Sequence, residues 1–289
     1  MRRADQQRGR LPSLARGMVL GLVLALALAG AARAAAASTD PPPTDPPPVL
    51  AADPASKPAA DTGSDRGEFK FTLGRYRLAS ETGSFVGTDL NLRWRRDGRN
   101  LWLGVYQDRA MGREFRAGYD DQWVLRDDPV LPVQLQPSLQ LASGGFVGGS
   151  LSVQVGSPFY AQVGIGRTNL RPYANLNFDP NDAVSAALGW QGAGGRQLQL
   201  LVIADDRLGT AQQHHHLMLR WPLLVDSSDP LRLTLDLLHK QGLGDTGAVS
   251  AWGWTLGLDG KFWFARLARD PKQNFSAQDA WRMSAGRRF

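Results

Sequence analysis

The sequence predicts an all-β protein, a transmembrane antiparallel up-and-down β-barrel of about 14 strands within residues 68–289. From Glu68 onward, apolar and polar residues alternate over segments of about ten residues, and a turn sequence follows each segment, as in the strands of membrane barrels. No stretch after residue 67 is apolar enough for a membrane helix or shows a helical apolar period. Merging or dropping one hairpin would give 12 strands, which is the alternative count.

The last strand ends the chain on an aromatic residue. Trp281, Met283, Ala285 and Phe289 share one parity, and the polar or small residues Arg282, Ser284, Gly286 and Arg288 share the other. This ending resembles the terminal strand of Gram-negative outer-membrane β-barrels of porin-like architecture, although it indicates no single named family. The resemblance implies an outer-membrane location, lipid around the barrel, and recognition of Phe289 by the barrel-assembly machinery.

Two N-terminal segments precede the barrel. Residues 1–37 combine a basic leader, the apolar run Met18–Ala29 and small residues of the A-x-A type, which is typical of a cleaved signal peptide; an uncleaved membrane anchor is the alternative. Residues 38–67 are rich in Pro, Ala and Asp and predict a disordered periplasmic linker. The chain has no cysteine, so disulfides and a lipoprotein anchor are excluded.

The net charge is concentrated in the leader. The chain holds 33 basic and 27 acidic residues, and residues 1–37 hold six arginines and one aspartate of these. The remainder therefore has 27 basic and 26 acidic residues, a net charge of +1. No nucleic-acid partner is expected, because binding would need a basic excess in the folded domain.

Alternation defines the strands. In one of them Leu90, Leu92 and Trp94 face one side while Asp89 and Arg93 face the other. We expect strands at 68–79, 86–96, 100–109, 113–124, 130–142, 146–156, 159–168, 182–191, 196–205, 211–222, 230–240, 248–258, 261–269 and 279–289. With both barrel ends periplasmic, the periplasmic turns are short and the longest connections lie outside, at 168–181, 241–247 and 270–278.

Large aromatic residues recur at the ends of strands that should meet the periplasmic interface of the membrane, where aromatic rings are favoured. The expected belt comprises Phe69, Trp94, Trp102, Trp123, Phe159, Trp190, Trp221, Phe262 and Phe289.

Three strands depart from simple alternation. In the first, Phe71 is on the odd parity and Tyr76 on the even, and we expect a bulge at Gly74 to restore one apolar face. The fourth places Asp121 on its apolar parity, and the segment Lys261–Leu267 is aromatic on both faces.

The inward parity is the expected functional surface, because it lines the lumen. The candidate pore-lining residues are Arg75, Arg77, Asp89, Arg93, Arg95, Glu114, Arg116, Gln134, Gln136, Arg220, Arg232 and Asp236. An arginine-rich wall favours anionic solutes by charge. The alternative is a network of salt bridges that closes the pore.

No catalytic, metal or cofactor site is expected. None of the four histidines, His214, His215, His216 and His239, has a serine within two or three positions along its strand. His214 and His216 share a face without an adjacent acid. The oxygen-rich stretch 177–182 fits a Ca²⁺ loop or an ordinary turn.

The predicted function is therefore a small passive channel for polar or anionic solutes. Two alternatives remain: a non-conducting structural or assembly barrel, and an outer-membrane enzyme that modifies lipid.

Overall fold

The computed structural model describes residues 67–81, 83–174, 182–224 and 230–289. The predicted signal peptide and almost all of the predicted linker lie outside these residues. Within them, no helix has the length and apolarity needed to cross a membrane.

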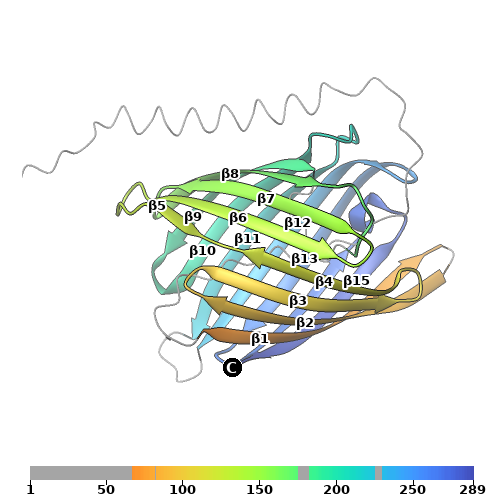
Figure 1. The fold of residues 1–289 in the computed structure, drawn as a ribbon, viewed down its shortest axis with the longest axis horizontal. Helices are drawn as coiled ribbons and strands as arrows, with labels where there is room; N and C mark the ends of the chain where they lie inside the picture. The colour runs from red at the N-terminus through yellow and green to blue at the C-terminus, as the bar shows by residue number, and fades with distance from the viewer. Residues whose placement is uncertain (1–66, 82, 175–181, 225–229) are drawn as a thin grey trace, which may run out of the picture.

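Antiparallel strands form one sheet that closes on itself, because β1 pairs with β15 (Figure 1). The elements are β1 (Glu68–Ser80), β2 (Gly83–Arg96), β3 (Arg99–Asp108), β4 (Gly112–Asp120), β5 (Trp123–Arg126), β6 (Val133–Ala142), β7 (Phe146–Val155), β8 (Phe159–Thr168), β9 (Ala183–Gly192), the 3₁₀-helix η1 (Ala193–Gly195), β10 (Arg196–Asp205), β11 (Gln213–Leu224), β12 (Leu231–Gly244), β13 (Gly247–Asp259), β14 (Trp263–Asp270), the 3₁₀-helix η2 (Gln273–Phe275) and β15 (Asp279–Arg288).

The barrel has 14 strand positions, because β4 and β5 both pair with β6 and occupy one position in succession. Asp121 lies at the break between them and accepts hydrogen bonds from the Tyr119 hydroxyl (2.7 Å) and the Trp123 indole N–H (2.8 Å). This interruption explains the irregular fourth strand. The prediction of about 14 strands is confirmed, and the alternative of 12 is wrong.

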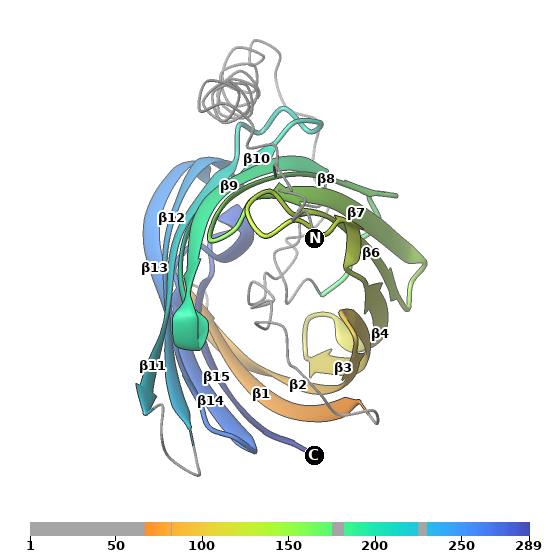
Figure 2. The ribbon, with the colours of Figure 1, turned by 90° about the vertical axis from the view of Figure 1, so that its left-hand side faces the viewer.

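The barrel has two different ends. We call the end with Glu68 and Phe289 the terminal end and the opposite end the loop end; Figure 2 shows the strands enclosing the lumen. Two residues, Asp97 and Gly98, join β2 to β3 at the terminal end. The long connection predicted at 241–247 is wrong, because β12 and β13 stay paired up to Gly244 and Gly247.

The outer face is apolar and has an aromatic belt near the terminal end. Seven of the nine predicted belt residues lie on this face, Phe262 lies in the turn before β14 at the same end, and Trp263 joins the belt. Trp102 is the exception: it points inward and is 5% exposed. Its cross-strand partner is Gly118, and a Cβ on that glycine would lie 2.3 Å from the Trp102 ring. The missing side chain makes the inward position possible.

The first strand has no bulge. Its register is continuous against both β15 and β2, so Tyr76 and Leu78 point inward and Arg75 and Arg77 point outward. The prediction that these two arginines line the lumen is wrong. The physical reason is packing, since Tyr76 and Leu78 belong to a buried cluster with Tyr106 inside the barrel.

The structure also shows which aromatic residues of the segment Lys261–Leu267 point inward. β14 begins at Trp263, so Phe262 belongs to the preceding turn and is 55% exposed. Phe264 is then the inward aromatic residue of this strand, and Trp263 points outward.

Candidate functional site in the barrel lumen

One side of the lumen is strongly cationic. The inner faces of β11–β15, β1 and β2 carry basic side chains towards the terminal end. These side chains are close enough to repel one another electrostatically. We call this set the cationic wall; it consists of Lys70, Arg93, Arg95, Arg220, Arg232, Arg266 and Arg288. Asp259 and Glu68 are the carboxylates within it, and Arg288 pairs with both. Seven cations against two carboxylates leave an excess of five positive charges.

An aromatic ring lies at the centre of the cationic wall. The Lys70 ammonium is 4.0 Å from the centroid of the Phe264 ring, and the guanidinium carbons of Arg288 and Arg266 are 5.4 and 5.6 Å from it. The ring face attracts cations electrostatically. Gly286 makes room for the ring, because a Cβ there would lie 2.5 Å from Phe264. The wall is therefore held partly by cation–π contacts.

The other side of the lumen is neutral. We call the inner faces of β6–β9, with Gln197 and Gln199 of β10, the glutamine wall; the described inner faces of β6–β9 carry no charged side chain. The Gln162 amide donates to Gln136 Oε1 (2.8 Å), and the Ser152 hydroxyl donates to the same oxygen (3.0 Å). Such hydrogen bonds link side chains within the wall, because amides both donate and accept.

A connection folds into the lumen from the loop end. Residues 169–174, which we call the inner segment, follow β8 and reach β4. The Ala174 N–H donates to Glu114 Oε1 (2.8 Å), and Arg116 donates to the Ala174 carbonyl (3.1 Å) while it pairs with Asp89 (2.5 Å). Ala174 also packs in the buried cluster of Tyr76, Leu78 and Tyr106. The inner segment therefore narrows the loop end.

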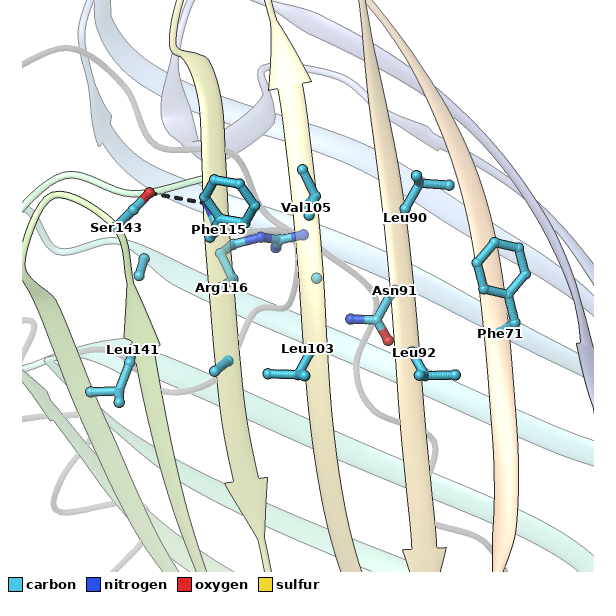
Figure 3. A pocket seen from close by; sticks show the side chains of 13 residues that line it. Phe71, Leu90, Asn91, Leu92, Leu103, Val105, Phe115, Arg116, Leu141 and Ser143 are labelled. Carbon is cyan, nitrogen blue, oxygen red and sulfur yellow. Dashed lines mark hydrogen bonds between the residues drawn. The ribbon is translucent and has the colours of Figure 1, made fainter.

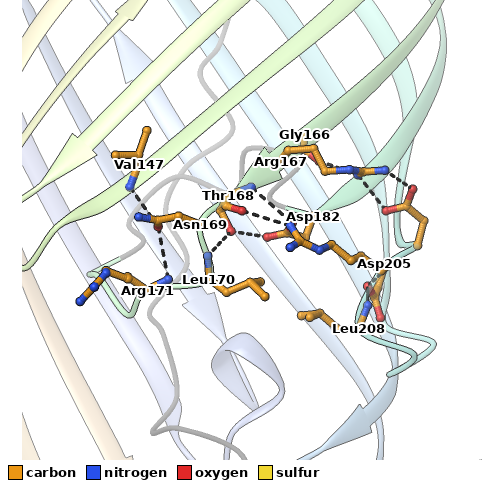
Figure 4. A network of polar contacts seen from close by, with 12 residues as sticks. Val147, Gly166, Arg167, Thr168, Asn169, Leu170, Arg171, Asp182, Asp205 and Leu208 are labelled. Carbon is orange, nitrogen blue, oxygen red and sulfur yellow. Dashed lines mark hydrogen bonds and ion pairs between the residues drawn. The ribbon is translucent and has the colours of Figure 1, made fainter.

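A polar network holds the base of this connection (Figure 4). Asp182 accepts from the Thr168 hydroxyl and pairs with Arg207 (2.5 Å). Asn169 accepts from the Val147 N–H (3.1 Å) and donates to the Gly145 carbonyl (2.7 Å). The connection is thereby fastened to β7, β9 and the end of β10.

The same network bears on the suggested Ca²⁺ loop at 177–182. Residues 177–181 lie outside the described residues, and Asp182 already has two partners. In the part of the chain that the structure describes, no group of three or more His, Cys, Asp and Glu side chains could hold a metal ion.

A second connection enters the lumen over β11 and β12. Phe275 of η2 is 2% exposed, and its ring centroid is 5.3 Å from that of His214. Beneath it, Lys240 pairs with Asp270 and donates to the Lys272 carbonyl (3.2 Å). His214 and His216 point into the lumen, as predicted. The His214 ring packs against Phe275 and so helps to hold η2 inside the barrel.

A concavity of about 590 Å³ lies on the outer face of β1–β4 and β6 (Figure 3). Its lining is apolar and includes Phe71, Leu90, Leu103, Phe115 and Leu141. These side chains point away from the lumen, so the concavity belongs to the surface that faces lipid.

Ten of the twelve candidate lumen residues point inward, in three groups. Arg93, Arg95, Arg220 and Arg232 belong to the cationic wall, and Gln134 and Gln136 to the glutamine wall. The remaining four are held in contacts: Asp89, Glu114 and Arg116 with the inner segment, and Asp236 with His216 Nδ1 (3.1 Å).

Sequence reasoning missed several inward charged residues. Lys70, Asp259, Arg266 and Arg288 were not among the candidates, although each alternates with outward neighbours. Applying strand parity to the whole of β13–β15 and β1 would have found them. The C-terminal candidate Phe289 is 65% exposed at the terminal end and stacks on Phe69 with ring centroids 5.9 Å apart.

One histidine meets a serine on the outer face. His239 Nε2 lies 3.3 Å from Ser250 Oγ across β12 and β13, a contact that spacing along a single strand does not reveal. Among the described residues, nothing is hydrogen-bonded to the other ring nitrogen of His239. The pair therefore lacks the orienting group that activates a nucleophile in a catalytic triad.

These features define the class of protein. A closed antiparallel barrel with an apolar, aromatic-belted outer face and a polar lumen is a transmembrane β-barrel of the outer-membrane type.

No family model matches the chain, and no curated protein matches it. Similar solved structures include the NanC porin (8% identity, 75% of this chain and 98% of that chain, TM-score 0.39) and the outer-membrane protein Omp33 of Acinetobacter baumannii (12%, 77% and 99%, TM-score 0.38). The KdgM porin is another (11%, 75% and 98%, TM-score 0.34). At these identities the likeness concerns the fold alone.

Proposed function

We propose that this protein is an outer-membrane channel for small anionic solutes. The observation that supports the proposal is the unequal lumen, in which a cationic wall with an excess of five positive charges faces an uncharged glutamine wall. Low-dielectric walls focus the field of such charges, so anions concentrate in the lumen and cations are excluded from it.

The two walls have different roles in this proposal. Arg93 and Arg95 are half-buried and so remain accessible to an anion in the lumen. Side-chain amides on the opposite wall offer both donors and acceptors to the polar part of a solute. The inner segment and η2 restrict the loop end, which supports passage of small solutes.

We further propose that the chain is exported by its signal peptide and inserted by the barrel-assembly machinery. Phe289 supports this step, because its ring is exposed at the terminal end, where another protein can reach it.

Single-channel recording of the full-length refolded protein in a planar bilayer tests the proposal. Under a KCl gradient we expect stable conductance steps and a reversal potential that indicates chloride preference. Circular dichroism and resistance to trypsin establish that the inserted protein is folded.

If the folded, inserted protein shows no conductance steps, the proposal is contradicted. This result would favour the second candidate, a non-conducting structural barrel, which the two inward-folded connections support.

A further inference from the structure

The outer face of β13, β14, β15 and β1 bears charged residues among apolar ones. In the strand register, Trp254 is opposite Arg269, Arg269 is opposite Trp281, and Trp281 is opposite Arg77. We call these four residues, with Arg75 two positions from Arg77, the arginine–tryptophan row. The three arginines are exposed on the outside of the barrel, and Trp281 is 44% exposed.

The row lies near the edge of the expected apolar band of the membrane. Phe69 marks the terminal-end belt, and eight residues of tilted strand place Arg77 about 20 Å above it. The apolar band of such barrels is about 25 Å tall. The two indole rings contact each other edge to face, with centroids 5.8 Å apart, and tryptophan is typical of the interface. The row is therefore at the depth of lipid headgroups.

Within the described residues, no carboxylate forms an ion pair with the arginines of the row. None of Arg75, Arg77 and Arg269 makes an ion pair with a residue in the described ranges, and the Arg269 guanidinium lies 5.9 Å from the Trp281 ring. Asp279, two positions from Trp281 on the same strand, accepts a hydrogen bond from the Lys272 N–H (3.0 Å). In the lumen, by contrast, Arg116 and Arg288 have carboxylate partners.

We infer that the arginine–tryptophan row is a docking surface for a phosphorylated glycolipid of the leaflet at the loop end. Guanidinium groups bind phosphate through two parallel hydrogen bonds and hold their charge at any physiological pH. Unpaired arginines on a lipid-facing surface are unfavourable unless water or an anionic headgroup at the membrane interface compensates their charge.

The spacing of the arginines selects the headgroup. Arg269 and Arg77 are two strands apart, which is about 10 Å. A headgroup with two phosphates on a sugar unit can pair one phosphate with each guanidinium, whereas a simple phospholipid offers a single phosphate to both. The longer connections of outer-membrane barrels face outward, so the loop end meets the outer leaflet of the membrane.

The test is native mass spectrometry of the full-length folded protein after incubation with diphosphoryl lipid A and release from detergent. The variant R75Q/R77Q/R269Q should retain about tenfold less of this lipid than the parent, because charge-assisted pairs are lost. The double variant R77Q/R269Q is matched by the control R109Q/R113Q, which makes the same charge change at exposed loop-end positions outside the inner segment and should retain as much lipid as the parent.

Two lipid controls separate the possible sources of binding. Monophosphoryl lipid A and phosphatidylglycerol should both be retained less than diphosphoryl lipid A. Equal retention of phosphatidylglycerol would overturn the inference in favour of a general anionic-lipid surface. Equal retention of lipid A by the parent and the triple variant would also overturn it.

Folding and function are checked independently. If the triple variant folds poorly, the single variants R77Q and R269Q allow the same comparison, each with a smaller loss. The row lies outside the lumen. The result of the lipid-binding test is therefore independent of whether the protein conducts ions.

Discussion

The cationic wall and the glutamine wall arise from the same strand alternation, yet they satisfy their polar groups differently. On the glutamine wall, Gln136 accepts from both Gln162 and Ser152, so neighbouring side chains bond to one another. On the cationic wall the side chains only donate, and two carboxylates and the Phe264 ring face seven cations. The neutral wall thus meets part of its hydrogen-bonding capacity internally, whereas a wall with excess charge needs water or anions from the lumen.

Reversing charge on the cationic wall should have the largest effect. The variant R93E/R95E lowers the excess from five positive charges to one, so anion preference should largely disappear. The reversal potential under a KCl gradient measures this. Arg116 is less suitable for this test, because it is held by Asp89 and Ala174.

The variant R93K/R95K is the matched control, since it keeps both charges and should keep anion preference. If R93E/R95E has the selectivity of the parent, neither arginine lies beside the conducting path.

Loosening the inner segment should have the next largest effect, on conductance rather than selectivity. Glu114→Ala leaves the Ala174 N–H without its acceptor, which should weaken the anchoring by about 1–3 kcal/mol. Single-channel recording should show larger or more frequent openings. Glu114→Gln retains an acceptor oxygen and should stay close to the parent; a larger conductance for Gln than for Ala would contradict this account of the anchor.

Changes on the glutamine wall should have the smallest effect. Gln162→Ala removes hydrogen bonds to Gln136 and Ser152, each worth about 0.5–1.5 kcal/mol, without changing any charge. Urea unfolding in lipid vesicles should show this modest loss, while the reversal potential stays unchanged. A shift in ion preference would mean that the neutral wall also contributes to selectivity.

The sequence predicted the barrel and most strands well, because two-residue alternation is a local property. It failed where contacts between distant residues decide orientation. Tyr76 points inward because the inner segment brings Ala174 against it, and nothing near Gly74 indicates this. Trp102 points inward because Gly118, on the next strand, leaves space for its ring.

The candidate site was predictable in composition but not in arrangement. Parity identified inward arginines such as Arg93 and Arg232, while the division into a charged and a neutral wall follows from which strands become neighbours on closure. The use of Glu114 and Arg116 to hold a connection depends on a contact about 60 residues away in sequence.

The seam between β1 and β15 has a consequence for how the chain reaches its native state. Phe69 and Phe289 exchange two backbone hydrogen bonds of 2.9 Å, and their rings stack. These partners are 220 residues apart, and pairings of such long separation form slowly because a large loop must close first. Until then both edge strands expose unpaired amides that could join the wrong strand of another molecule. Until Phe69 and Phe289 pair, these edge amides stay exposed, so we expect this stage of folding to be the one most prone to aggregation.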